Sequence, residues 1–161
     1  MKISYKWLTD YIEIDVSPAE LKNLMTFAGI EVEAVENPGE SLANIVVGEI
    51  LSKEQHPDAD KLSVCKVSTG GEEIQVVCGA PNCATGQKIA FAPVGTVLGE
   101  IKLKKIKLRD VVSMGMICAE DEIGLSDSHD GIMVLADDAV PGTPMADYLG
   151  VTDTVYDVEI T

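Results

Sequence analysis

Aromatic side chains are scarce in this sequence, whose 161 residues include one Trp, four Tyr and two Phe. Proteins that hold single-stranded nucleic acid commonly stack its bases on exposed aromatic rings. Between positions 53 and 109, Phe91 is the one aromatic residue. Stacking of bases is therefore poorly supported, and a folded RNA recognised by its shape and phosphates is the more plausible nucleic-acid partner.

Long apolar runs are also missing. No stretch approaches the roughly 18 consecutive apolar residues that a transmembrane helix requires, and the first six residues lack the apolar centre of a secretory signal. The sequence thus predicts a cytoplasmic protein with no membrane partner. Apolar residues still make up 46% of the chain, which excludes wholesale disorder and predicts one folded domain, with or without a small satellite.

Paired cysteines, the usual mark of a zinc site, are absent. The four cysteines form no Cys-x-x-Cys pair, and the two histidines are far apart in sequence. We expect reduced thiols that pack as small apolar side chains, and no bound metal. The positions concerned are Cys65, Cys78, Cys83, Cys118, His56 and His129.

One short acidic cluster leaves an alternative open. His56, Asp58 and Asp60 could serve a metal-dependent hydrolase. The same residues also suit a Pro-containing turn in which the Asp side chains bond backbone amides, and we favour the turn.

Basic residues are missing from the last third of the chain. Residues 110–161 carry a charge of −12, residues 1–52 carry −6 and residues 53–109 carry +3, which gives −15 in all. The whole-chain charge predicts repulsion of nucleic acid. The segment charges instead indicate a single basic strip within an acidic frame.

That strip lies within residues 100–109, and we use the name basic strip for its five cations: Lys102, Lys104, Lys105, Lys107 and Arg109. The pattern predicts one strand with a bulge at positions 104–105, so that all five cations share one exposed face. The apolar residues Ile101, Leu103, Ile106 and Leu108 would then point inward. The alternative is a solvated face whose lysines protect a strand edge from aggregation.

The first forty residues are expected to be largely helical. Ser4 can cap a short helix that Trp7 anchors to the core, and a second helix begins at Ser17-Pro18-Ala19-Glu20, a capping box with Pro at its first position. Gly29 should end that helix. A strand follows at 30–35, and residues 37–39 mark a domain boundary.

Short strands with turn punctuation dominate after residue 45. This pattern predicts a small Greek-key barrel. We expect strands at 45–51, 62–67, 74–78, 88–92, 100–109 and 132–135, a helical turn at 116–123, and a short helix at 144–149. Residues 153–161 alternate like a strand that is cut off mid-run, which suggests a piece of a longer protein.

Three motifs resemble those of the tRNA-binding OB domain family. Residues 56–62 (HPDADKL), 77–82 (VCGAPN) and 107–118 (KLRDVVSMGMIC) match its signatures in order and in spacing. The flanks, including the opening MKISYKWL and the stretch 29–33 (GIEVE), are similar to the bacterial phenylalanyl-tRNA synthetase beta subunit. The sequence departs from the family pattern at Asp110, where that family usually has Gly. Asp110 places a negative charge beside Arg109, which puts phosphate binding at this position in question.

The resemblance implies a mainly β fold with short helices: an OB barrel, residues 39–151, inserted into a partial α+β domain, residues 1–38 and 152–161. The parent enzyme in that family is an α2β2 ligase that uses ATP and Mg²⁺ to join phenylalanine to its tRNA, with catalysis in the alpha subunit. This fragment would hold no catalytic residue and no cofactor. It would give tRNA weak auxiliary phosphate contacts, through the basic strip and Lys61, and would bind no DNA. The alternative is a protein-interaction scaffold or subunit interface without RNA binding.

Overall fold

The computed structural model describes residues 1–160 and divides the chain into two compact units. One unit comprises residues 1–40 and the C-terminal residues from 150 onward, and the other comprises residues 41–149. The fold is mainly β with short helices, as the sequence predicts.

The first unit is a three-stranded antiparallel sheet with two helices. Its elements are β1 (Lys2–Ser4), α1 (Tyr5–Thr9), α2 (Pro18–Phe27), β2 (Glu31–Glu36) and β12 (Val155–Glu159). The sheet order is β1-β12-β2, so the C-terminal strand lies between two N-terminal ones. The alternation over 153–161 therefore predicts a strand correctly, although Thr161 lies outside the described residues.

Local capping explains where the two helices begin. The Ser4 side chain accepts a hydrogen bond from the Trp7 N–H, and the expected capping box between Ser17 and Glu20 is present. Gly29, with a φ of 88°, follows the end of α2 in the conformation that glycine adopts most easily. The prediction that Trp7 is a core anchor is wrong. Its ring is 54% exposed and packs edge-on against Tyr11.

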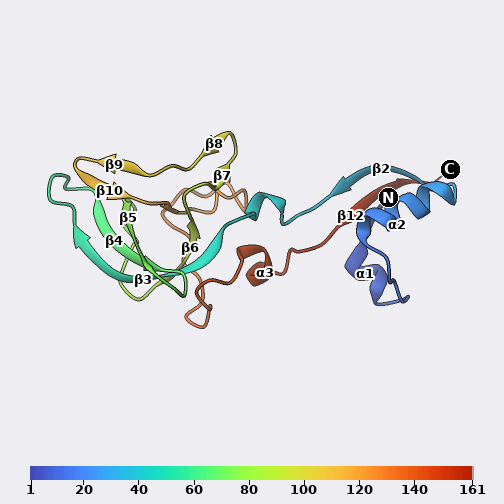
Figure 1. Ribbon diagram of the computed structural model, residues 1–161, viewed down its shortest axis with the longest axis horizontal. Coiled ribbons are helices and arrows are strands. Elements are labelled where there is room, and N and C mark those ends of the chain that lie inside the picture. Colours follow the sequence, from blue (N-terminus) through green and yellow to red (C-terminus); the bar gives the residue numbers. More distant parts are fainter. Residues whose placement is uncertain (161) are drawn as a thin grey trace. The chain divides into compact units, whose positions relative to one another are not determined.

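The second unit contains a five-stranded antiparallel sheet that curves into a nearly closed OB-type barrel (Figure 1). Its strand order is β11-β6-β3-β4-β5. The strands are β3 (Val46–Gln55), β4 (Ser63–Ser68), β5 (Glu73–Cys78), β6 (Lys88–Ala92) and β11 (Met116–Ile117). The expected strands at 45–51, 62–67, 74–78 and 88–92 are confirmed.

Two small hairpins and two short helical elements complete the chain. The hairpins pair β7 (Val97–Leu98) with β8 (Ile101–Lys102), and β9 (Ile106–Leu108) with β10 (Val111–Ser113). The helical elements are η1 (Glu40–Leu42) and α3 (Met145–Leu149), the latter as predicted.

Two predictions for the barrel are wrong. Residues 116–123 are not one helical turn, because Met116 and Ile117 pair with Ala92 and Phe91 as an edge strand, and a hydrogen-bonded turn begins only at Glu120. Residues 132–135 form no strand either, and contribute a single bridge between Val134 and Ile89. Pairing with neighbours far along the chain decides both cases, and local periodicity does not report it.

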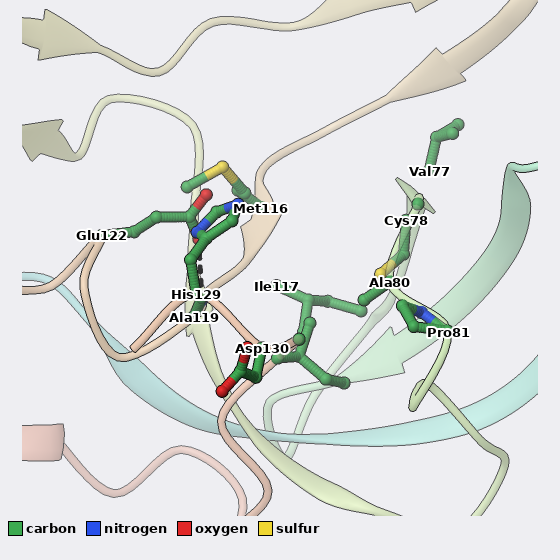
Figure 2. A pocket seen from close by; sticks show the side chains of 13 residues that line it. Val77, Cys78, Ala80, Pro81, Met116, Ile117, Ala119, Glu122, His129 and Asp130 are labelled. Atoms are coloured by element: carbon green, nitrogen blue, oxygen red, sulfur yellow. Dashed lines mark hydrogen bonds between the residues drawn. The ribbon is translucent and has the colours of Figure 1, made fainter. Parts of the chain in front are cut away.

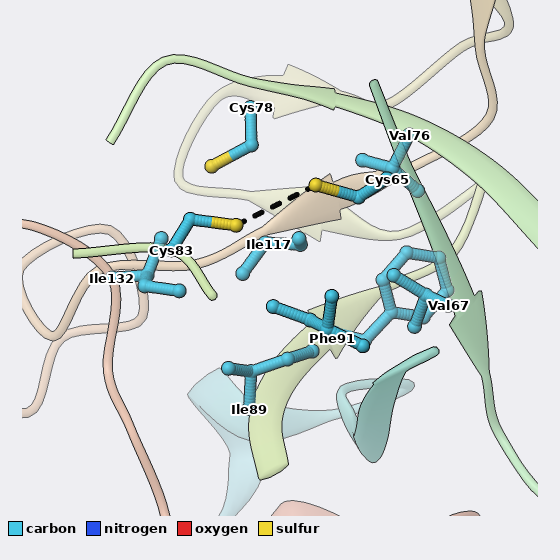
Figure 3. Packing of buried hydrophobic residues seen from close by; sticks show 10 residues of the cluster. Cys65, Val67, Val76, Cys78, Cys83, Ile89, Phe91, Ile117 and Ile132 are labelled. Carbon is cyan, nitrogen blue, oxygen red and sulfur yellow. Dashed lines mark hydrogen bonds between the residues drawn. The ribbon is translucent and has the colours of Figure 1, made fainter. Parts of the chain in front are cut away.

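Cysteines form part of the barrel core, as Figure 3 shows. Cys65, Cys78 and Cys83 are buried free thiols among Val67, Val76, Ile89, Phe91, Ile117 and Ile132. The Cys65 and Cys83 sulfur atoms are 3.5 Å apart. Burial raises the pKa of the Cys118 thiol to about 12, so at neutral pH it stays protonated and unreactive. The expectation of reduced, packed thiols is confirmed.

Among residues 1–160, none of the helices combines the length and apolar character needed to cross a bilayer.

Candidate nucleic-acid interface

The basic strip is not one bulged strand. It is divided between β8, which contains Lys102, and β9, which contains Lys107, and these strands belong to different two-stranded sheets. The segment between them stays attached to the first hairpin, because the Leu103 N–H donates to the Thr96 carbonyl at 2.8 Å. Figure 1 shows β8 and β9 following one another along one side of the barrel.

The expected division into inward and outward side chains holds only in part. All five cations are exposed, and Leu103 and Leu108 are half-buried. Ile101 and Ile106 are wrongly predicted to point inward, since they are 68% and 49% exposed. Short separate hairpins have little core to cover, so these two apolar side chains stay in solvent between the lysines.

The side chains of the strip differ in how they are engaged. Lys107 pairs with Asp110 at 3.1 Å, and the Arg109 guanidinium donates to the Asp58 carbonyl at 2.5 Å. Within the described residues, no hydrogen bond or ion pair from a side chain engages Lys102, Lys104 or Lys105. Those three ammonium groups are therefore the ones free to meet an anion.

A tight turn ends the strip. Leu108 pairs with Val111, so Arg109 and Asp110 are the two central residues of the β9–β10 hairpin, with φ values of 46° and 69°. Positive φ at both positions defines a type I′ turn, which favours Asn or Asp followed by Gly. This geometry explains why Gly suits position 110 and why Asp is a tolerable replacement there.

His56 holds this hairpin to the 56–62 turn. The ring is 2% exposed, its Nδ1 accepts from the Asp58 N–H at 3.0 Å, and its Nε2 lies 3.0 Å from the Leu108 carbonyl. The proton therefore resides on Nε2, which donates to Leu108. The turn interpretation is right, but the acceptor is the histidine ring and no Asp side chain bonds an amide there. Sequence reasoning missed this role, because a buried His and a solvated one look alike in a Pro-containing turn.

Lys61 is exposed on the same turn and lies outside the basic strip. The hydrogen bond from Arg109 to the Asp58 carbonyl joins the turn to the end of the strip. The structure thus connects the two sets of predicted cations through His56 and Arg109.

No group of three His, Cys, Asp or Glu side chains in the described part of the chain is arranged to hold a metal ion. Both nitrogens of His56 are engaged by backbone groups, so His56, Asp58 and Asp60 do not present a ligand set.

Comparison with known proteins shows which family the second unit belongs to. The family model described as "Putative tRNA binding domain" matches residues 45–144, which cover the barrel and both hairpins. The chain belongs to this tRNA-binding domain family. Its second unit is the family's domain, and the basic strip, the His56 turn and the type I′ turn all lie within the matched residues.

Curated relatives match the chain from end to end. It is 51% identical to the phenylalanine--tRNA ligase beta subunit of Hahella chejuensis and 48% identical to that of Coxiella burnetii. Each alignment covers 100% of this chain and 20% of the relative, so the chain spans about a fifth of their length. A solved MetRS related protein from Pyrococcus horikoshii superposes with a TM-score of 0.46 at 18% identity, covering 81% of this chain and 97% of the other.

Replacing Asp110 with Gly should raise both the stability of this domain and its affinity for tRNA. Gly adopts the positive φ of position 110 without strain, so we expect the free energy of unfolding to rise by about 0.5 kcal/mol. The change also removes the carboxylate that pairs with Lys107. tRNA affinity at low salt should then rise about threefold. Chemical denaturation and fluorescence anisotropy measure the two effects.

Asp110→Asn is the matched control, because it removes the charge but keeps a side chain that tolerates positive φ. It should raise tRNA affinity as much as Asp110→Gly with little gain in stability. Unchanged affinity in both variants would show that position 110 does not face the RNA.

Proposed function

We propose that this chain is a non-catalytic tRNA-binding and structural portion of the beta subunit of a phenylalanine--tRNA ligase. The membership of its barrel in the tRNA-binding domain family supports this role, as does the beta-subunit similarity that extends over the whole chain. In this proposal the complete enzyme works in the cytoplasm, pairs this subunit with an alpha subunit as an α2β2 assembly, and uses ATP and Mg²⁺.

The basic strip gives auxiliary contacts to tRNA phosphates. The observation that carries this assignment is that Lys102, Lys104 and Lys105 are exposed and lack side-chain partners among the described residues. Lysine binds phosphate as a mobile point charge, so these contacts add affinity without reading sequence. The acidic remainder of the chain, at −18 against +3 for residues 53–109, keeps the affinity of the isolated chain low.

Titration of labelled tRNA with the chain, by fluorescence anisotropy at low salt, tests this proposal. We expect saturable binding that weakens steeply as salt is added. Absence of binding at low salt would refute the RNA role.

A subunit-interface role is the second candidate, and exposed apolar side chains on the hairpins favour it. Val97 is 57% exposed, Ile101 68% and Ile106 49%, and such side chains suit a protein partner better than a phosphate backbone. A pull-down with the cognate alpha subunit distinguishes the two. Capture of the alpha subunit by the isolated chain, with no affinity for tRNA, would favour the interface.

A further inference from the structure

The barrel has a gap between its two edge strands. β5 and β11 contact one another, yet they form no ladder, since the sheet order runs β11-β6-β3-β4-β5 without closing. Next to this gap β5 is joined to β10 instead, where the Val77 N–H donates to the Ser113 hydroxyl, and the Met114 N–H donates to the Gln75 carbonyl at 2.9 Å. A hollow of about 610 Å³ opens where the two strands separate. Ligand sites commonly have volumes of roughly 300–1,000 Å³.

Most of this hollow is apolar, and its walls face each other (Figure 2). Val77, Cys78, Ala80 and Pro81 lie on one side, and Met116 lies opposite them with the polar residues Glu122 and His129. Asp130 is the second acidic residue of the lining. The apolar wall accepts one face of a flat ring system, which gains from burial without any aromatic stacking partner. The scarcity of aromatic residues therefore does not exclude base binding at this position.

The polar side of the hollow is held in place before any ligand arrives. One Glu122 oxygen accepts from the Ala119 N–H at 2.7 Å, which fixes the half-buried carboxylate. His129 Nδ1 lies 2.9 Å from Asp121, and this hydrogen bond raises the pKa of His129. The ring therefore keeps its second proton to higher pH than an isolated histidine, and in that charged form its second N–H is a donor beside the Glu122 acceptor.

This donor and acceptor set matches one nucleobase best. Guanine presents two neighbouring N–H donors, N1–H and the 2-amino group, which one carboxylate can accept together. Its O6 accepts from a donor such as His129. Uracil has a single N–H between two carbonyl oxygens, which a carboxylate repels. The same logic, carboxylate to N–H and donor to carbonyl, governs recognition of unstacked bases on their pairing edges.

A second hollow, of about 380 Å³, shares the turn of residues 79–81 with the first. It is lined by Lys53, Lys61, Gln55 and Ser63, with Asp60 as its acidic member. Lys53 is positioned by donating to the Cys83 carbonyl at 2.6 Å. Two ammonium groups next to an apolar hollow offer a place for the phosphate of a nucleotide whose base fills the first hollow.

We propose that an unpaired guanine nucleotide of RNA binds across the 79–81 turn, with its base between β5 and β11 and its phosphate near Lys53 and Lys61. The inference rests on the proposed RNA-binding function and adds a base-reading subsite that is separate from the basic strip. It also gives Lys61 a specific role. A nucleotide suits the two hollows better than a peptide, because it joins an anion to a flat ring that carries N–H donors.

Amide NMR of the 161-residue chain, titrated with guanosine and inosine 5′-monophosphates, tests this site. Inosine monophosphate lacks only the 2-amino group. We expect both to shift amides near Gly79, Met116 and Gly131, with inosine monophosphate binding about tenfold more weakly. Uridine monophosphate should bind more weakly still. Equal affinities for the three nucleotides, or shifts confined to residues 102–109, would overturn the proposal.

Two substitutions separate the base from the phosphate. Glu122→Gln keeps the bond to Ala119 through its amide oxygen but loses the paired acceptor, and should abolish the preference for guanosine over inosine monophosphate. Lys61→Ala should weaken the binding of guanosine monophosphate several-fold. The affinity for guanosine, the nucleoside without a phosphate, should not change. If either variant behaved like the unaltered chain, the corresponding contact would be wrong.

Failure of this inference is distinguishable from failure of the proposed function. Alanine at Lys102, Lys104 and Lys105 should lower tRNA affinity but leave guanosine monophosphate binding unchanged. Binding of tRNA without nucleotide shifts in the hollow would overturn the guanine site alone. Nucleotide shifts in a chain that does not bind tRNA would overturn the proposed function and leave the hollow as a nucleotide site.

Discussion

Replacing Lys102, Lys104 and Lys105 together with Glu should weaken tRNA binding about 100-fold at low salt, or ~2.7 kcal/mol. These residues are exposed and have no side-chain partner in the described part of the chain, so their charge is available to RNA. Reversal removes three attractive contacts and adds three repulsive ones within one segment. Fluorescence anisotropy with labelled tRNA measures the change.

A matched variant controls for net charge. Lys2, Lys6 and Lys22 lie in the other unit, are also exposed, and change the charge by the same amount when replaced with Glu. This control should lose less than tenfold in affinity, because it lowers the net charge by the same amount without removing a cation of the basic strip. Equal losses in the two variants would mean that total charge, and not the basic strip, governs binding.

His56→Ala should destabilise the barrel unit by about 3 kcal/mol. The substitution leaves a cavity in place of a buried ring and removes the partners of the Asp58 N–H and the Leu108 carbonyl. Because Leu108 belongs to β9, the loss of this hydrogen bond should also destabilise the end of the basic strip. Urea denaturation of the chain, monitored by far-UV circular dichroism, gives the free energy of unfolding.

His129 provides the control. Its side chain is 70% exposed and bonds only Asp121 among the described residues, so His129→Ala should change stability by less than about 0.5 kcal/mol. Similar effects of the two substitutions would contradict the assignment of His56 as the link between the turn and the hairpin.

The barrel strands could be predicted from sequence because each carries its own signal. β4 and β5 are short runs rich in Val and Ile on either side of the Gly70-Gly71 turn. The Ser17–Glu20 capping box marks the start of α2 without reference to the rest of the chain. Short-range physics decides these elements, so short-range patterns predict them.

The candidate site was harder to predict because distant partners shape it. The basic residues were identified correctly as exposed, but their division between two hairpins depends on bonds such as that from Leu103 to Thr96. The role of His56 depends on Leu108, 52 residues away. The hollow between β5 and β11 arises from incomplete closure of the sheet, which no local pattern encodes.

The dependence of tRNA affinity on salt tests the central claim most directly. The slope of log Kobs against log salt counts the phosphates that a protein neutralises, at roughly 0.7–0.9 per contact. If Lys102, Lys104 and Lys105 each contact phosphate, their joint replacement with Ala should reduce the slope by about 2. Parallel lines for the variant and the unaltered chain would contradict the assignment of the basic strip to tRNA phosphates.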